Sequence, residues 1–194
     1  MVNWMAVQAM GTVALVATSA GAIAYAGLQL KHEREYRSIA NLEKHLSTFL
    51  SDPFLAARRK LAQDRMDGDR LRPLDKMDPP VSVFEVLDFY EHLGLLVKKG
   101  NLNVYDVWHT FYEWAQPVYA DLKPVIEDRD SPYIDHYLDL RRLMIAMDSL
   151  QRSHMHNQKT QHWTLWTAER ILAHYKYELE VSGTTRRIRG RRGI

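Results

Sequence analysis

The chain contains no cysteine in its 194 residues, so disulfide bonds, zinc–thiolate sites and cysteine nucleophiles are excluded. Glycine and proline are sparse, with nine and seven residues, whereas 46% of the residues are hydrophobic. This composition is typical of a folded globular protein and not of a disordered chain. The sequence also lacks an alternating strand pattern and any internal repeat. It therefore predicts an all-α fold with one main domain and appendages.

Charged side chains are absent from the first 30 residues. The uncharged run from Val2 to Leu30 exceeds the roughly 20 residues that span a bilayer, and Trp4 and Tyr25 lie near its two edges. A secretion signal is one alternative, but the run is too long for one and no Lys or Arg precedes it. A soluble alanine-rich helix is the other, but its apolar side chains would need partners on several faces at once. The sequence therefore predicts that residues 1–30 are a retained transmembrane anchor.

Basic residues follow this run closely, and none precedes it. By the positive-inside rule, Lys31, Arg34 and Arg37 place the N-terminus outside and the bulk of the chain in the cytoplasm. Small residues four apart, such as Ala17 and Gly21, also allow close approach of two such helices. The membrane bilayer is thus one predicted partner, and self-association through the transmembrane helix is another.

Beyond Leu30 the apolar residues recur at spacings of three and four, as on one face of a helix, and no Gly or Pro interrupts them before Ser51. The transmembrane helix is therefore expected to continue without a break to about Ser51. Further helices follow, and together they predict an antiparallel bundle of about five helices. The predicted organisation is a transmembrane anchor over 1–30, a helical stalk over 31–51, a helical bundle over 52–182 and a disordered arginine-rich tail over 183–194.

Local signals predict where the helices of the bundle begin and end. Asp52-Pro53 opens the first of them, and residues 67–81 form a loop by composition. Pro117 is expected on the solvent face of a continuous helix, because the apolar stripe keeps its phase past it. The remaining expected ends are a capping box at Ser82 and Glu85, a stop at Gly100, starts at Asn103, Ser131-Pro132 and about Gln161, and a stop at Gly183.

No catalytic or cofactor motif is present. His154 and His156 form an H-x-H whose rings point to different sides of a helix, and no H-E-x-x-H occurs. Glu85 and Asp88 share a face that is otherwise solvated. The sequence thus predicts a protein that is not an enzyme and that carries no metal or cofactor. For Trp163 and Trp166 two alternatives remain, which are core packing and contact with a partner or the membrane surface.

Charged residues interrupt the apolar arcs of two helices at matching positions. Glu91 and Lys98 lie seven residues apart on one helix, and Arg141 and Asp148 lie seven apart on another, with complementary charges. They predict buried ion pairs Glu91–Arg141 and Lys98–Asp148 that specify the fold and play no part in catalysis. The alternative is that these charged side chains lie at the border of the apolar face and extend into water.

The C-terminal segment carries five arginines within residues 184–194, which favours binding to anionic lipid. Nucleic-acid binding without base specificity and a purely solubilising role are the alternatives. The predicted lipid-binding residues are Arg186, Arg187, Arg189, Arg191 and Arg192.

Residues 89–130 contain Tyr90-Glu91 before "LGLLVKKG", then "LNVYDVW", then a Trp and a Pro before an Arg. In these elements the chain resembles the bacterial and phage family known as domain of unknown function 4760. The resemblance implies a small membrane-tethered helical protein, and it supplies no activity and no catalytic residues.

We therefore expect a single-pass helical interaction or scaffold protein, or an accessory subunit of a membrane assembly, at the inner membrane of a bacterium. A phage-defence or superinfection-exclusion effector acting at that membrane is the alternative. An enzyme would need clustered polar residues in a pocket, which the sequence does not indicate.

Overall fold

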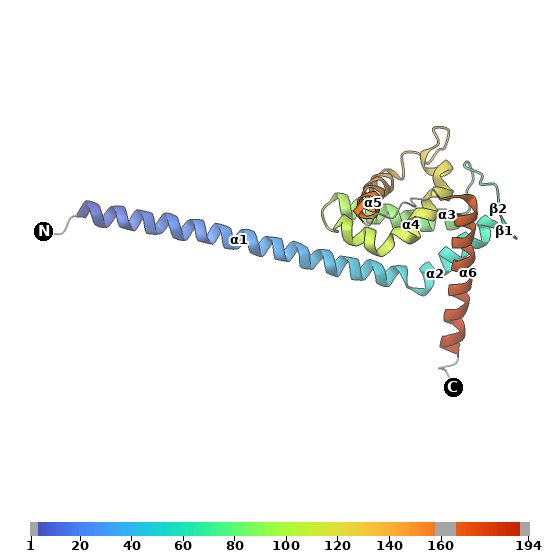
Figure 1. Ribbon diagram of the computed structural model, residues 1–194, viewed down its shortest axis with the longest axis horizontal. Coiled ribbons are helices and arrows are strands. Elements are labelled where there is room, and N and C mark those ends of the chain that lie inside the picture. The colour runs from blue at the N-terminus through green and yellow to red at the C-terminus, as the bar shows by residue number, and fades with distance from the viewer. Residues whose placement is uncertain (1–3, 158–165, 191–194) are drawn as a thin grey trace. The chain divides into compact units, whose positions relative to one another are not determined.

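The computed structural model describes the backbone of residues 4–157 and 166–190, and the side chains of residues 25–154 and 166–180. Its helices and strands follow the chain in a simple order (Figure 1). They are α1 (Trp4–Phe49), α2 (Asp52–Arg65), β1 (Met66–Asp67), β2 (Arg70–Leu71), α3 (Val81–Lys98), α4 (Val104–Glu127), α5 (Leu138–Asn157) and α6 (Ala168–Gly190). The predicted all-α class is confirmed. The two short strands form an antiparallel hairpin within the predicted loop.

The chain divides into two units, Met1–Ala40 and Asn41–Ile194. The described part of the first unit consists of helix α1, which continues into the second unit and ends at Phe49. This finding confirms the predicted unbroken helix. Its physical reason is that neither Gly nor Pro occurs between Gly27 and Pro53 to interrupt it. Pro53 lies in the first turn of α2, as the sequence predicts, since the first turn leaves its N–H groups without helical partners anyway.

The predicted transmembrane anchor gains no support from the structure. Within the part of the chain that the structure describes, no helix is long and apolar enough to cross a membrane. The side chains of residues 1–24, which make up most of the predicted span, lie outside that part.

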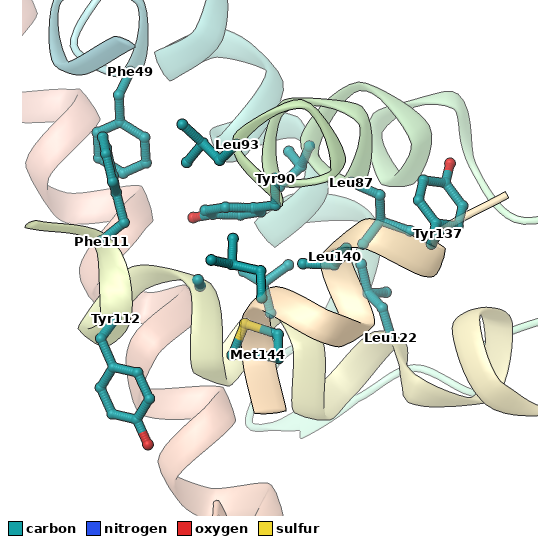
Figure 2. Packing of buried hydrophobic residues seen from close by; sticks show 14 of the residues in the cluster. Phe49, Leu87, Tyr90, Leu93, Phe111, Tyr112, Leu122, Tyr137, Leu140 and Met144 are labelled. Carbon is teal, nitrogen blue, oxygen red and sulfur yellow. The ribbon is translucent and has the colours of Figure 1, made fainter. Parts of the chain in front are cut away.

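Helices α2–α6 form the second unit, in which α3 packs against α5, α2 against α3 and α6, and α4 against α5 and α6. Their apolar faces meet in one core, and Figure 2 shows Tyr90 near the middle of the drawn side chains, with the hydroxyl groups of Tyr112 and Tyr137 directed to the edges. The Tyr112 hydroxyl donates to Asp148 and the Tyr137 hydroxyl donates to Asp88, so both hydroxyl groups have hydrogen-bond partners at the edge of the core. The predicted bundle of about five helices is thus confirmed.

Two helix ends follow the local signals. Gly100 has a φ of +70°, a conformation that glycine adopts without strain, and its N–H donates to the Val97 carbonyl to close α3. The Oδ1 atom of Asn103 accepts from the N–H of Tyr105, 2.9 Å away, and caps α4.

Other predicted ends are wrong because tertiary contacts override local signals. Helix α3 begins at Val81, and the Ser82 hydroxyl donates to Asp64 instead of capping its own helix. Helix α5 begins at Leu138 and not after Pro132, since the Ser131 hydroxyl bonds back to the Val125 carbonyl and holds a turn there.

The environment of Pro117 and the end of the last helix also differ from the prediction. Pro117 is buried within the continuous helix α4. Helix α6 begins at Ala168, and the residues from 158 to 165, where its start was expected, lie outside the described part. It continues through Gly183 to Gly190, because one glycine costs a helix only about 1 kcal/mol. Residues 183–190 are therefore helical, contrary to the predicted disorder.

Candidate functional site

A pocket of about 360 Å³ opens beside helices α4 and α6, and we call it the aromatic pocket. Its size falls in the range of pockets that bind small molecules or single side chains. Three of its lining residues carry large aromatic rings. The lining residues are Glu113 and Trp114 from α4, Trp166 before α6, and Arg170, Ala173, His174 and Tyr177 from α6.

Helical periodicity places these side chains together. Residues 170, 173, 174 and 177 recur at spacings of three and four, so they share one face of α6. Trp114 faces them from α4, with its ring centroid 5.8 Å from those of both His174 and Tyr177. This spacing falls within the range of favourable aromatic pairs. The ring of Trp114 therefore forms a wall of the pocket between the two helices.

The buried arginine Arg58 packs against the Trp114 ring. The Arg58 guanidinium carbon lies 4.5 Å from the Trp114 ring centroid and 4.0 Å from that of Phe49. Arg58 also pairs with the carboxylate of Glu178, and each side chain is only 5% exposed. A third contact runs from its Nη1 to the Phe49 carbonyl oxygen, 3.4 Å away. These contacts link the end of α1 to α4 and α6 and hold the Trp114 ring in place.

His174, with a side chain 9% exposed, is the least exposed titratable group among the lining residues that the structure describes, and it is neutral at pH 7. Burial, together with the nearby positive charge of Arg58, lowers its pKa to about 4. Burial raises the pKa of Glu178, although the Arg58 charge opposes that shift. The Nε2 atom of His174 lies 3.8 Å from Glu178. Because its pKa is so low, His174 offers the pocket a neutral imidazole instead of a positive charge.

The outer edge of the pocket contains polar side chains that are exposed to solvent. The Arg170 guanidinium carbon lies 4.5 Å from the ring centroid of Trp166, and Tyr177 is 51% exposed. Among the lining residues that the structure describes, the phenol of Tyr177 is the one hydroxyl group. Among the described residues, no group of three or more His, Asp or Glu side chains is placed to hold a metal ion. The arrangement is suited to binding an apolar group by ring stacking.

The low pKa of His174 makes the stability of the bundle depend on pH. Between pH 6.5 and 4 the unfolded chain protonates this histidine while the folded chain does not, so stability falls as the pH is lowered through this window. With a folded pKa of about 4, the loss is about 3 kcal/mol. We expect wild type to lose about that much more stability than His174→Phe, which keeps a ring against Trp114, when both are unfolded in urea at pH 7 and pH 4. Equal losses in the two proteins would contradict the assigned pKa.

Glu178 has the opposite effect on the pH dependence of stability, because its raised pKa adds stability as the pH falls. It is present in both proteins, so the difference between them reports His174.

A second buried polar cluster lies between α2, α4 and α6. The Nε and Nη2 atoms of Arg65 donate to the two carboxylate oxygens of Asp121, at 2.7 and 2.9 Å. The Tyr175 hydroxyl donates to the same carboxylate at 2.8 Å, and Arg65 Nη1 donates to the Arg72 carbonyl. Every charge in this cluster is paired, so we assign it to the fold and not to binding.

Sequence reasoning missed both buried arginines, although a signal was present. The buried face of α2 has the spacing of a single helix face, and Arg58 and Arg65 occupy two of its positions. A charge on an apolar stripe indicates a buried partner, and the same argument singled out Glu91 and Arg141. The partners of these two arginines, Glu178 and Asp121, lie more than 50 residues away in the chain, and no local pattern identifies them.

The predicted ion pair between Glu91 and Arg141 is not formed. The Glu91 carboxylate instead accepts from the backbone N–H groups of Asp139 at 3.2 Å and Leu140 at 2.6 Å, so it caps the N-terminus of α5. Arg141 donates to the Ile134 carbonyl. The prediction that Glu91 lies at the contact between two helices is correct. Its predicted partner was a side chain, whereas its partners in the structure are backbone N–H groups.

Lys98 and Asp148 also have partners other than those predicted. Lys98 pairs with Asp139, 2.9 Å away, and Asp148 accepts from Tyr112 and Gln116. The difference arises because Gly94 and Lys98 both approach Asp139 at the start of α5, so Lys98 meets this residue and not Asp148.

The remaining predicted site residues are only partly described. Trp166 lines the aromatic pocket, whereas Trp163 lies outside the described residues. The side chains of Arg186, Arg187 and Arg189 also lie outside them, and so do Arg191 and Arg192 entirely. Lipid binding by this segment stays a prediction.

Comparison of the chain with protein-family models, curated proteins and solved structures finds no match. The resemblance over residues 89–130 therefore also stays a prediction.

Proposed function

We propose that this protein is a membrane-anchored helical interaction protein that binds a partner protein at the aromatic pocket. The observation that carries the proposal is the composition of the pocket, where two tryptophans, a tyrosine and an arginine gather at one opening. Trp, Tyr and Arg are the residue types that contribute most to binding energy in protein interfaces.

The surroundings of the pocket support a binding role. Arg58 holds Trp114 from behind through stacking, and its own charge is paired with Glu178. A wall that is already ordered loses little conformational entropy when a partner binds, which favours affinity.

The proposed anchor rests on the sequence alone. It consists of the uncharged run over residues 2–30, with Lys31, Arg34 and Arg37 directly after it. In this arrangement the N-terminus lies outside and the bundle lies in the cytoplasm of a bacterial cell, so that its partner belongs to a membrane assembly.

Membrane fractionation tests the anchor. The full chain is expected in the membrane pellet after an alkaline carbonate wash. A Leu15→Arg, Ile23→Arg double variant is expected to leave it, because each central arginine costs insertion about 2.5–3.5 kcal/mol. The control places two arginines outside the run, as Glu43→Arg and Ser47→Arg, and is expected to stay in the pellet. Release of wild type by the wash would contradict the anchor.

Affinity isolation from detergent-solubilised membranes tests the pocket. Tyr177 and Tyr105 form a matched pair, since each is 51% exposed and each packs beside a tryptophan. We expect Tyr177→Ala to lose at least tenfold of the co-isolated partner and Tyr105→Ala to retain it. Equal recovery by both variants would contradict binding at the pocket.

A further inference from the structure

We infer that the aromatic pocket receives an uncharged aromatic side chain of the partner protein. The inference rests on the proposed function and specifies which chemical group the partner inserts.

The charges around the pocket favour an uncharged occupant. Glu113 and Arg170 contribute one charge of each sign to the lining, and His174 is neutral. Behind Trp114 the charges of Arg58 and Glu178 also cancel, because they form an ion pair. A charged occupant would therefore lose its hydration in the pocket without meeting a net opposite charge, which is unfavourable.

The walls favour an aromatic occupant. Trp114, Trp166 and Tyr177 line the pocket with aromatic rings, and Ala173 contributes a small side chain. Aromatic rings gain additional attraction from stacked and edge-to-face contacts, beyond the burial of their area. An aliphatic side chain would gain the burial alone.

The polar groups favour a protein as the source of this ring. Glu113 and Arg170 contribute one charge of each sign to the lining, so charged groups border the aromatic rings. Hydrophobic anchors with a polar rim are the usual arrangement of protein interfaces.

Three naphthalene derivatives of equal size test the charge preference on the full chain in detergent. They are 2-naphthamide, which is neutral, 2-naphthoate, which is negative, and 2-naphthylmethylamine, which is positive at pH 7. Ligand-observed NMR measures their affinities. We expect 2-naphthamide to bind about tenfold more tightly than either charged compound, and Tyr177→Ala to weaken it by at least tenfold. Tyr105→Ala is the matched control and is expected to bind like wild type. Because the detergent is the same for all proteins, differences between them report the pocket.

Photo-crosslinking in intact membranes tests the source of the ring. A p-benzoylphenylalanine at Glu113 is expected to cross-link to a partner segment centred on Phe, Tyr or Trp, and 2-naphthamide is expected to reduce this product. The same photoreactive residue at Tyr105 is expected to give a product that 2-naphthamide does not affect.

Each other outcome overturns the inference in a distinct way. Tighter binding of a charged naphthalene contradicts the uncharged occupant. A competed cross-link to a segment without an aromatic residue contradicts the aromatic occupant, while the proposed function stands. Naphthamide binding without any protein cross-link at Glu113 assigns the pocket to a free small molecule, and then the proposed function fails as well.

Discussion

Replacing Gly94 with alanine is expected to destabilise the bundle by about 3 kcal/mol or more, at the upper end of the usual cost of overpacking. A Cβ atom at this position would lie 2.3 Å from the carbonyl oxygen of Asp139 and 2.9 Å from the backbone nitrogen of Leu140. Both are backbone atoms at the start of α5, and they cannot move aside as a flexible side chain would. The substitution must therefore push α3 and α5 apart, although these two helices share an extensive contact.

Gly27→Ala is the matched control for this prediction. Gly27 lies in helix α1, and a Cβ atom there would have no atom within 4 Å besides those of its chain neighbours and of the helix's own backbone. We expect Gly27→Ala to be neutral or slightly stabilising, since alanine favours a helix over glycine by up to about 1 kcal/mol. Urea unfolding of the full chain, followed by tryptophan fluorescence, measures both variants. A Gly94→Ala protein as stable as Gly27→Ala would show that α3 and α5 do not approach as closely as the structure places them.

Asp121→Asn is expected to cost about 3–5 kcal/mol, the usual effect of removing one partner from a buried ion pair. Asp121 accepts two hydrogen bonds from Arg65 and one from Tyr175, and the side chains of the pair are only 4–5% exposed. Asparagine has nearly the same shape, but it removes the negative charge, and its amide NH₂ would face the guanidinium of Arg65, which can only donate. The guanidinium of Arg65 is then buried without a counter-charge.

Two further variants distinguish the removal of both partners of the ion pair from the removal of one partner, which leaves the other charge buried alone. Arg65→Met is expected to be as costly as Asp121→Asn, because it leaves the Asp121 carboxylate buried. The double variant Arg65→Met, Asp121→Asn is expected to be less costly than the sum of the two single variants, because neither charge then remains. Asp69→Asn breaks the exposed pair between Asp69 and Lys176 and is expected to leave the stability unchanged. Additive costs in the double variant would show that Arg65 and Asp121 do not depend on each other.

Features that depend on a few neighbouring residues were predictable from the sequence. The stop of α3 at Gly100 and the start of α4 at Asn103 rest on contacts within three residues of the cap. The unbroken helix α1 and the all-α class follow from spacing and from the lack of Gly and Pro over most of that segment. The sequence also indicated that Trp166 faces either the core or a partner, and it lines the aromatic pocket.

The sequence by itself determined where most helices form and where most of their apolar stripes lie, because a helix depends on its own backbone and on a periodic apolar stripe. Only the tertiary structure decided which groups meet across those faces. Glu91 binds the backbone at the start of α5, Arg58 joins Trp114 to Glu178, and the Ser82 hydroxyl turns to Asp64. Each of these contacts joins residues at least 18 positions apart in the chain. Their partners depend on how the helices shift and rotate when the core packs, which no local pattern specifies.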